Sequence, residues 1–159
     1  MRIGQGFDAH ALVRGIPLVL GGVPIVHERG LAGDSDGDVL VHAVMDALLG
    51  AAHLGDMGTW FRSDDAEVQG ARSLLLLKKV WFMMEQKGFQ LESLDATIVA
   101  ERPRLFEFRL DMERNLAEVL KADPQRISVK AKTTDGLGFA GRGEGMAAYA
   151  NLLLYERPE

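Results

Sequence analysis

The chain has 159 residues, of which 47% are hydrophobic and 26% charged, so it can bury one ordinary core without covalent staples. It has no cysteine, which excludes disulfides and thiolate zinc sites and suits a reducing cytoplasm. The net charge of −5 argues against nucleic-acid binding, and no apolar run approaches the roughly 20 residues that span a bilayer. The N-terminus shows no signal segment. We expect one cytoplasmic domain over residues 1–159, with no nucleic-acid or membrane partner.

The first third of the chain alternates in hydrophobicity and then becomes helical. Paired glycines supply the positive φ of a tight hairpin turn, and acidic residues before an apolar run are typical of a helix entry. The expected elements are a strand over Ile3–His10, a hairpin of Leu18–Leu20 and Val23–Val26 joined by Gly21-Gly22, and a helix over Asp38–His53 that is entered at Asp36 or Gly37.

The remainder of the chain contains two long irregular stretches, Gly55–Gly70 and the glycine-rich Asp135–Gly145. Between and after them the expected elements are a helix over Ala71–Lys87, a strand over Leu94–Ala100, a helix over Leu105–Lys121, a strand over Ile127–Thr133 and a strand over Met146–Tyr155. A strand–helix–strand series predicts a parallel, right-handed crossover. The fold class is therefore α+β, a single domain with a mixed sheet and helices packed on one face.

A candidate metal site is split between the first strand and the first helix. Asp8 and His10 are two residues apart, so in a strand they project from the same face. With His42 they offer two imidazoles and one carboxylate, a set that suits zinc and leaves a fourth position open to substrate. Asp46, one helical turn beyond His42, could orient that imidazole. The alternative for the strand pair is a hydrogen-bonded histidine in a strand-end turn.

The other two histidines do not fit this site. His53 follows His42 by 11 residues, which places it about 16 Å further along a helix axis. His27 stands at a strand edge without a ligand-like neighbour. We therefore expect neither to bind the metal.

Three loop segments have both a functional and a structural interpretation. Ser35–Asp38 could bind a ligand or could simply cap a helix, because acidic residues there complement the helix dipole. Thr133–Gly145, with its hydroxyls, glycines and Arg142, could hold phosphate oxygens, be a flexible loop, or pack about a symmetry axis. Ala100–Leu105 could present backbone groups to a base, or could be a proline-initiated helix start with solvated charges.

Taken in order, these segments closely resemble the family of 2-C-methyl-D-erythritol 2,4-cyclodiphosphate synthases of the non-mevalonate isoprenoid pathway. The resemblance runs from end to end. The matching motifs, some with single unmatched positions inside them, are Arg2–His10, Ser35–His42, Asp46–Ala52, Leu54–Gly58, Lys130–Thr134 and Leu137–Gly145.

The resemblance implies a homotrimer around a threefold axis, with three active sites between adjacent subunits. The substrate would be 4-diphosphocytidyl-2-C-methyl-D-erythritol 2-phosphate, whose 2-phosphate attacks the β-phosphorus, forms the cyclic diphosphate and expels CMP. It implies that Asp8, His10 and His42 are the ligands of Zn²⁺ or another divalent ion at the β-phosphate. It also implies that Asp135 lies near a second divalent ion, Mg²⁺ or Mn²⁺, held with the substrate diphosphate.

The same resemblance implies the substrate contacts. Asp8, His10, Asp34, Ser35 and Asp135 would surround the phosphates, and Thr133 would help to hold the transition state. The methylerythritol pocket would include Asp56, Gly58, Phe61, Ser63 and Asp65. The cytidine side, contributed by the neighbouring subunit, would include Ala100, Arg104, Leu105, Phe106, Lys132 and Thr133. Phe7, Phe139 and Arg142 would line an axial cavity that takes an isoprenoid diphosphate.

The sequence departs from the family pattern at three of these positions. Asp34 replaces a histidine that would donate to a phosphate, Ser63 replaces a common aspartate in the sugar loop, and Asp135 is one methylene shorter than the usual glutamate. Two other functions remain compatible with the residues. One is a trimer that keeps the fold and metal but mainly binds nucleotides or isoprenoid diphosphates. The other is a zinc phosphohydrolase that uses water at the open metal position.

Overall fold

The computed structural model describes residues 1–156, so the last three residues of the expected domain, 157–159, lie outside it. The strands are β1 (Arg2–Arg14), β2 (Leu18–Leu20), β3 (Val23–Ile25), β4 (Arg29–Leu31), β5 (Phe89–Val99), β6 (Ile127–Lys132) and β7 (Gly145–Glu156). The helices are α1 (Val39–Ala51), α2 (Met57–Trp60), α3 (Ser73–Gln86), α4 (Arg109–Val119) and α5 (Gly138–Gly141), with 3₁₀ turns at Phe106–Phe108 and Pro124–Arg126.

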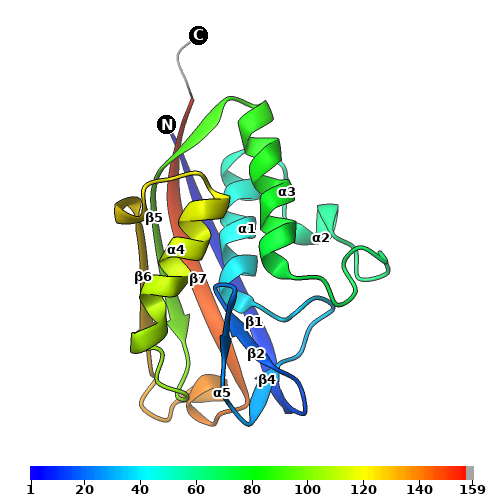
Figure 1. Ribbon diagram of the computed structural model, residues 1–159, viewed down its shortest axis with the longest axis vertical. Helices are drawn as coiled ribbons and strands as arrows, with labels where there is room; N and C mark the ends of the chain where they lie inside the picture. The colour runs from blue at the N-terminus through cyan, green and yellow to red at the C-terminus, as the bar shows by residue number, and fades with distance from the viewer. Residues whose placement is uncertain (157–159) are drawn as a thin grey trace.

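Within residues 1–156, five strands form a mixed sheet in the order β4-β1-β7-β5-β6 (Figure 1). Its neighbours pair antiparallel except β5 and β6, which run parallel and are joined through α4, as the strand–helix–strand pattern predicts. The predicted hairpin is also confirmed, since β2 pairs antiparallel with β3. The fold is α+β, with a curved mixed sheet and helices.

The long helices α1, α3 and α4 lie on one face of the sheet (Figure 1). α1 is buried almost all round, because the sheet covers one side of it and α3 the other. The opposite face of the sheet exposes apolar side chains of the paired strands β1 and β7, namely Ile3, Phe7, Tyr149 and Leu153. No helix within residues 1–156 is long and apolar enough to cross a membrane.

Two glycines of β1 let α1 approach the sheet very closely. A Cβ atom added at Gly4 would overlap the carbonyl oxygen of Ala47, and one at Gly6 would overlap that of Ala43. Backbone therefore packs on backbone where a side chain would hold the two elements apart. This contact lies beside the residues of β1 and α1 that carry the candidate metal ligands.

The start of α1 is fixed by Asp38, which corrects the expected entry at Asp36 or Gly37. Its fully buried carboxylate accepts hydrogen bonds from the amides of Val41, Gly21 and Gly22, at 3.1, 2.9 and 2.7 Å. Burial raises the pKa of Asp38 to about 6, although these three amides favour the charged form. One side chain thus caps the helix and ties it to the turn of the β2–β3 hairpin.

Several expected boundaries are wrong, and each error has a tertiary cause. β5 begins at Phe89 rather than Leu94, because its first residues pair with the end of β7. β4 is absent from the sequence prediction, since Arg29–Leu31 is too short to show a period and is a strand through pairing with β1. The helix expected from Leu105 starts as a 3₁₀ turn and becomes α-helical at Arg109. The short helices α2 and α5 lie inside the two stretches expected to be irregular.

Candidate metal centre and substrate site

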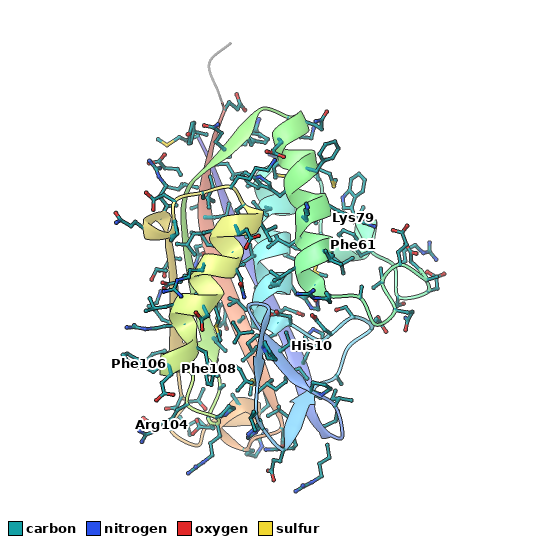
Figure 2. All side chains as sticks on the ribbon, viewed as in Figure 1. His10, Phe61, Lys79, Arg104, Phe106 and Phe108 are labelled. Carbon is teal, nitrogen blue, oxygen red and sulfur yellow. The ribbon has the colours of Figure 1, made fainter. Side chains whose placement is uncertain are left out.

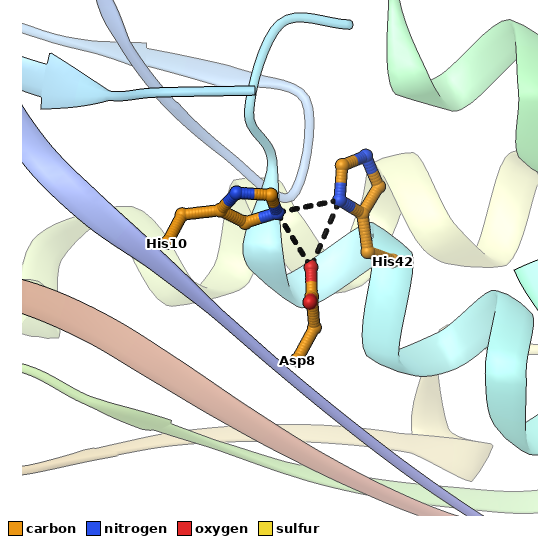
Figure 3. Close-up of side chains that lie close together, drawn as sticks. All are labelled: Asp8, His10 and His42. Atoms are coloured by element: carbon orange, nitrogen blue, oxygen red, sulfur yellow. Dashed lines mark hydrogen bonds and ion pairs between the residues drawn. The ribbon is translucent and has the colours of Figure 1, made fainter. Parts of the chain in front are cut away.

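Asp8, His10 and His42 converge on one point between β1 and α1 (Figure 3). Oδ2 of Asp8 lies 2.6 Å from Nε2 of His10 and 3.0 Å from Nδ1 of His42. The two ring nitrogens are 3.0 Å apart. The structure therefore brings together the three residues that sequence spacing and the resemblance both single out.

These three atoms fit a divalent metal ion. Tetrahedral zinc with bonds of about 2.0–2.1 Å holds its ligand atoms roughly 3.3 Å from one another, so the observed triangle needs to open only slightly. The donors are one carboxylate oxygen and two imidazole nitrogens, the set that suits zinc. The site could hold a metal with three protein ligands and one position left for substrate.

The ionisation of the group also favours a cation. Burial raises the pKa of Asp8, but hydrogen bonds and charge from His10 and His42 outweigh it and hold that pKa well below the usual range. The hydrogen bond to Asp8 raises the pKa of His10 against the effect of burial, and the charge of Asp34 adds to the rise. The negative charge that raises the pKa of His10 also attracts a metal cation electrostatically.

The second nitrogen of His42 meets hydroxyl groups rather than the expected carboxylate. Nε2 lies 2.9 Å from Oγ of Ser73 and 3.0 Å from Oγ of Ser35. Asp46 instead accepts the amide hydrogen of Met57 at 2.8 Å, where α2 begins. The expectation that Asp46 orients His42 is therefore wrong. Ser73 was missed because it starts a different helix, and no local pattern connects it with His42.

The segment beside the metal centre is bonded to the start of α3. Ser35 is half-buried and contacts both His42 and Ser73, whereas Asp34 is exposed. The carbonyl of Asp34 accepts the amide hydrogen of Gly70 at 2.7 Å, and the amide of Asp36 donates to Ala71. These backbone bonds hold the 34–36 segment next to the end of the long loop.

The residues expected around methylerythritol belong to that loop and to α2. Asp56 caps α2 by accepting from the amide and the hydroxyl of Thr59, and Gly58 lies in its single turn. Phe61 is half-buried against the core, while Ser63 and Asp65 are exposed. The loop is tied to α3 by an ion pair between Glu67 and Lys79.

The residues expected on the cytidine side line one cavity of about 300 Å³. It lies between the ends of β5 and β6 and the start of α4, and its lining includes all six of them: Ala100, Arg104, Leu105, Phe106, Lys132 and Thr133. The ring of Phe106 is exposed and lies under the guanidinium of Arg109, 4.1 Å away. A volume near 300 Å³ is at the lower end of ligand pockets.

The turn that carries Asp135 is held by a residue that the sequence did not single out. Glu101 accepts hydrogen bonds from the amide and hydroxyl of Thr134, at 2.7 and 3.1 Å, and these bonds lower its pKa. Asp135 is exposed, with a positive φ of 52°, and lies outside the metal cluster. The partner of Glu101 is 33 residues away, so no local pattern indicates this contact.

Two residues expected at the axial cavity lie near the glycine-rich turn. Phe139 is in α5 and is 41% exposed, and Arg142 follows it and pairs with Glu144 at 2.8 Å. Phe7 is on the uncovered sheet face, where its ring lies 5.0 Å from that of Tyr149. All three are accessible in a single chain.

The candidate metal centre and the cavity between β5, β6 and α4 are separate in this chain. The lining of the cavity includes none of Asp8, His10 and His42. In Figure 2, Phe61 lies on the α3 side of the fold, whereas Arg104 and Phe106 lie on the opposite side below α4, with His10 between. The residues expected at the metal and those expected at the cytidine therefore lie in two separate places of this chain.

The chain was compared with known proteins. The model of the YgbB family matches residues 1–155. The 2-C-methyl-D-erythritol 2,4-cyclodiphosphate synthase of Geobacter metallireducens is 55% identical over 157 residues, which cover 99% of this chain and 100% of that protein.

Solved structures agree with this match. The bifunctional IspDF of Campylobacter jejuni superposes with a TM-score of 0.94 at 42% identity, over 98% of this chain and 42% of that one. The CDP complex of IspF from Plasmodium falciparum has a TM-score of 0.86 at 31% identity, over 99% and 97% of the two chains. The chain therefore belongs to the YgbB family, that of the 2-C-methyl-D-erythritol 2,4-cyclodiphosphate synthases.

Proposed function

We propose that this protein converts 4-diphosphocytidyl-2-C-methyl-D-erythritol 2-phosphate to 2-C-methyl-D-erythritol 2,4-cyclodiphosphate and CMP, a step of isoprenoid precursor biosynthesis. The observation that carries the proposal is the convergence of Asp8, His10 and His42 in a chain 55% identical to a named synthase. The reaction is a phosphorus–oxygen bond exchange within one substrate. A 2-phosphate oxygen bonds to the β-phosphorus, and the bond from that phosphorus to the CMP oxygen breaks.

This reaction needs no protein nucleophile, because the substrate supplies the attacking oxygen. The work of the chain is positioning and charge neutralisation. A Zn²⁺ ion at Asp8, His10 and His42 would supply positive charge beside the β-phosphate. Ser35, next to His42, is placed to donate a hydrogen bond to a phosphate bound there.

The nucleotide is proposed to occupy the cavity lined by Arg104 and Lys132, whose positive charges suit the phosphate of the CMP unit. Thr133, which also lines that cavity, would contact the reacting phosphates and help to hold the transition state. Asp135 follows in the next turn and would lie beside a second ion, Mg²⁺ or Mn²⁺. The methylerythritol unit would contact Asp56, Gly58, Phe61, Ser63 and Asp65.

We further propose that three copies assemble around a threefold axis and complete each site between neighbours. The separation of the metal centre from the nucleotide cavity supports this, because a second copy can bring the cavity to the metal. The uncovered sheet face also supports it, since Ile3 is 75% exposed and Phe7 44%. Phe7, Phe139 and Arg142 would then face the axis and line a cavity for an isoprenoid diphosphate.

The test is incubation of the purified protein with the cytidylyl substrate, Zn²⁺ and Mg²⁺. We expect release of CMP together with the phosphorus NMR signals of a cyclic diphosphate. Release of CMP without the cyclic product would indicate a phosphohydrolase. Binding of CDP without CMP release above background would indicate the nucleotide-binding function, which the carboxylate of Asp34 favours. Either result would refute the synthase.

A further inference from the structure

Behind the metal centre lies a buried polar chain that the proposed reaction does not use. Ser73 is fully buried at the start of α3, and its hydroxyl lies 2.9 Å from Nε2 of His42 and 3.1 Å from Oγ of Ser35. The same hydroxyl donates to the carboxylate of Asp36. His42, Ser73 and Asp36 therefore form one continuous hydrogen-bonded chain that leads away from the metal position.

The hydrogens of this chain have one consistent arrangement. Nδ1 of His42 points at Asp8 and His10, so it must offer a lone pair if it is to bind a metal ion (Figure 3). The neutral ring then carries its hydrogen on Nε2, which donates to Ser73. Because the hydroxyl hydrogen of Ser73 is donated to Asp36, the Ser73 oxygen keeps a lone pair free to accept the hydrogen on Nε2 of His42.

Hydrogen bonds from two backbone amides also hold the Asp36 carboxylate in place. Arg72, the residue before α3, makes no capping bond, so the first amides of the helix need another acceptor. Asp36 supplies it across the chain by accepting the amide hydrogen of Ser73 at 3.0 Å. Its other oxygen also accepts from the amide of Asp38 at 3.2 Å. Both carboxylate oxygens thus accept from backbone amides, and this orientation directs one of them at the Ser73 hydroxyl.

We propose that Asp36 and Ser73 are positioning residues that orient His42 and select the tautomer whose Nδ1 binds the metal. The inference rests on the proposed metal site and adds to it a carboxylate–hydroxyl–imidazole relay. The negative charge of Asp36 polarises the Ser73 hydroxyl, so the Ser73 oxygen accepts more strongly from Nε2–H of His42. The imidazole then donates the electron pair of Nδ1 to the metal more strongly. Outer partners of this kind change metal affinity by about 10- to 100-fold.

The experiment titrates the metal-free, full-length protein with Zn²⁺ against a chromophoric chelator. Ser73→Ala removes the acceptor for Nε2–H and is expected to weaken zinc binding about 10- to 100-fold. Asp36→Asn is nearly the same size, but its amide cannot accept from both the Ser73 amide and the hydroxyl. Its NH₂ group either opposes the Ser73 amide or turns the hydroxyl toward His42, which favours the wrong tautomer. A loss of the same order is expected.

Two further measurements separate a relay from a general loss of structure. The double variant should bind zinc about as weakly as Ser73→Ala alone, because both residues act through one chain. Ser128→Ala, at an exposed serine of β6, should bind like the wild type. In the Co²⁺-loaded protein, Ser73→Ala should shift the visible bands of the metal.

The inference is overturned if Asp36→Asn binds zinc within about twofold of the wild type, or if the two losses simply add. Circular dichroism of the metal-free variants shows whether each is folded, and Asp36→Asn carries the test if Ser73→Ala is not. A wild-type protein that binds no zinc would instead refute the metal site of the proposed function. The two failures are therefore distinguishable.

Discussion

Asp34 places a carboxylate beside the candidate metal centre, at a position where the family resemblance implies a histidine. Its charge contributes to the raised pKa of His10, so the two groups interact. A phosphate bound about 4 Å from this carboxylate would be repelled by ~4 kcal/mol at an effective dielectric near 20. The side chain is exposed, so it can turn toward solvent and away from a phosphate.

We therefore expect Asp34→His to leave turnover unchanged or to raise it, because it replaces a repelling charge by a donor. Initial rates of CMP release with Zn²⁺ and Mg²⁺ measure this. Asp34→Asn is the matched control, since it removes the charge without adding an imidazole. A large fall in both variants would show that the carboxylate has a positive role.

The pH dependence of metal binding follows from His10. The hydrogen bond to Asp8 raises the pKa of His10 above its ordinary value of 6.5. Protonated imidazole cannot bind a metal ion, so zinc affinity should be full above the raised pKa and fall as the pH drops through it. The decline should thus begin above pH 6.5. Chelator competition from about pH 8.5 to about pH 5.5 measures it, and a flat profile across that range would contradict the assignment of His10.

For single residues, the sequence predicts contact partners only where the two residues are close along the chain. Asp8 and His10 are recognisable as a pair because a strand fixes their common face. Ser73 and Glu101 are ordinary in their local sequence, and each acquires its partner, His42 or Thr134, only through folding. Asp46 shows the converse error. Its helical spacing from His42 is right, but α2 offers its carboxylate a backbone amide instead.

Among the elements, the contact between β1 and α1 decides whether the metal site exists. Asp8 and His10 belong to β1 and His42 to α1, so any change in the separation of these elements moves the ligands apart. Gly4 and Gly6 set that separation, because their missing side chains leave room for the α1 backbone.

Gly6→Ala should therefore damage both stability and metal binding. The added methyl group overlaps the Ala43 carbonyl, and such overpacking typically costs about 1–3 kcal/mol. Urea denaturation and zinc titration measure the two effects. Gly50→Ala, in α1 itself, is the control, because a Cβ there meets nothing within 4 Å and should stabilise the protein by up to ~1 kcal/mol. Zinc binding by Gly6→Ala equal to that of Gly50→Ala would contradict this role.

The elements themselves were predictable in proportion to their length. α1, α3 and β7 each carry enough residues to show a period, and their interiors were placed from sequence. β4, α2 and α5 have three or four residues each, so no period can appear in them. Pairing with β1 stabilises β4, the Asp46 carboxylate accepts from the first amide of α2, and α5 follows a turn of positive-φ residues at 135 and 136.

At the scale of the molecule, the chain presents two proposed half-sites and an uncovered apolar sheet face. The cavity proposed for the nucleotide is formed at the ends of β5 and β6, and the candidate metal centre lies between β1 and α1. In a ring of three subunits with a head-to-tail contact, each metal centre can meet the cavity of one neighbour.

Mixed trimers test this arrangement directly. His42→Ala should remove the metal half-site. The double variant Arg104→Ala/Lys132→Ala should remove the positive charges that bind the nucleotide. Each protein alone should therefore be inactive. Co-expression of the two should restore about one quarter of wild-type activity per site, because random assembly pairs two intact halves that often. No recovery in trimers verified by analytical ultracentrifugation would mean that each subunit uses its own two half-sites.

The sequence by itself determined the α+β pattern, the hairpin, the parallel crossover and the grouping of Asp8, His10 and His42. These depend on periods and spacings within one segment or on motifs in order. Only the tertiary structure decided that Ser73 rather than Asp46 meets His42, that Asp38 caps α1 and the hairpin together, and that the metal and nucleotide residues lie apart in one chain. Those outcomes depend on how closely β1, α1 and α3 pack, and packing distances are set by contacts between residues far apart in sequence.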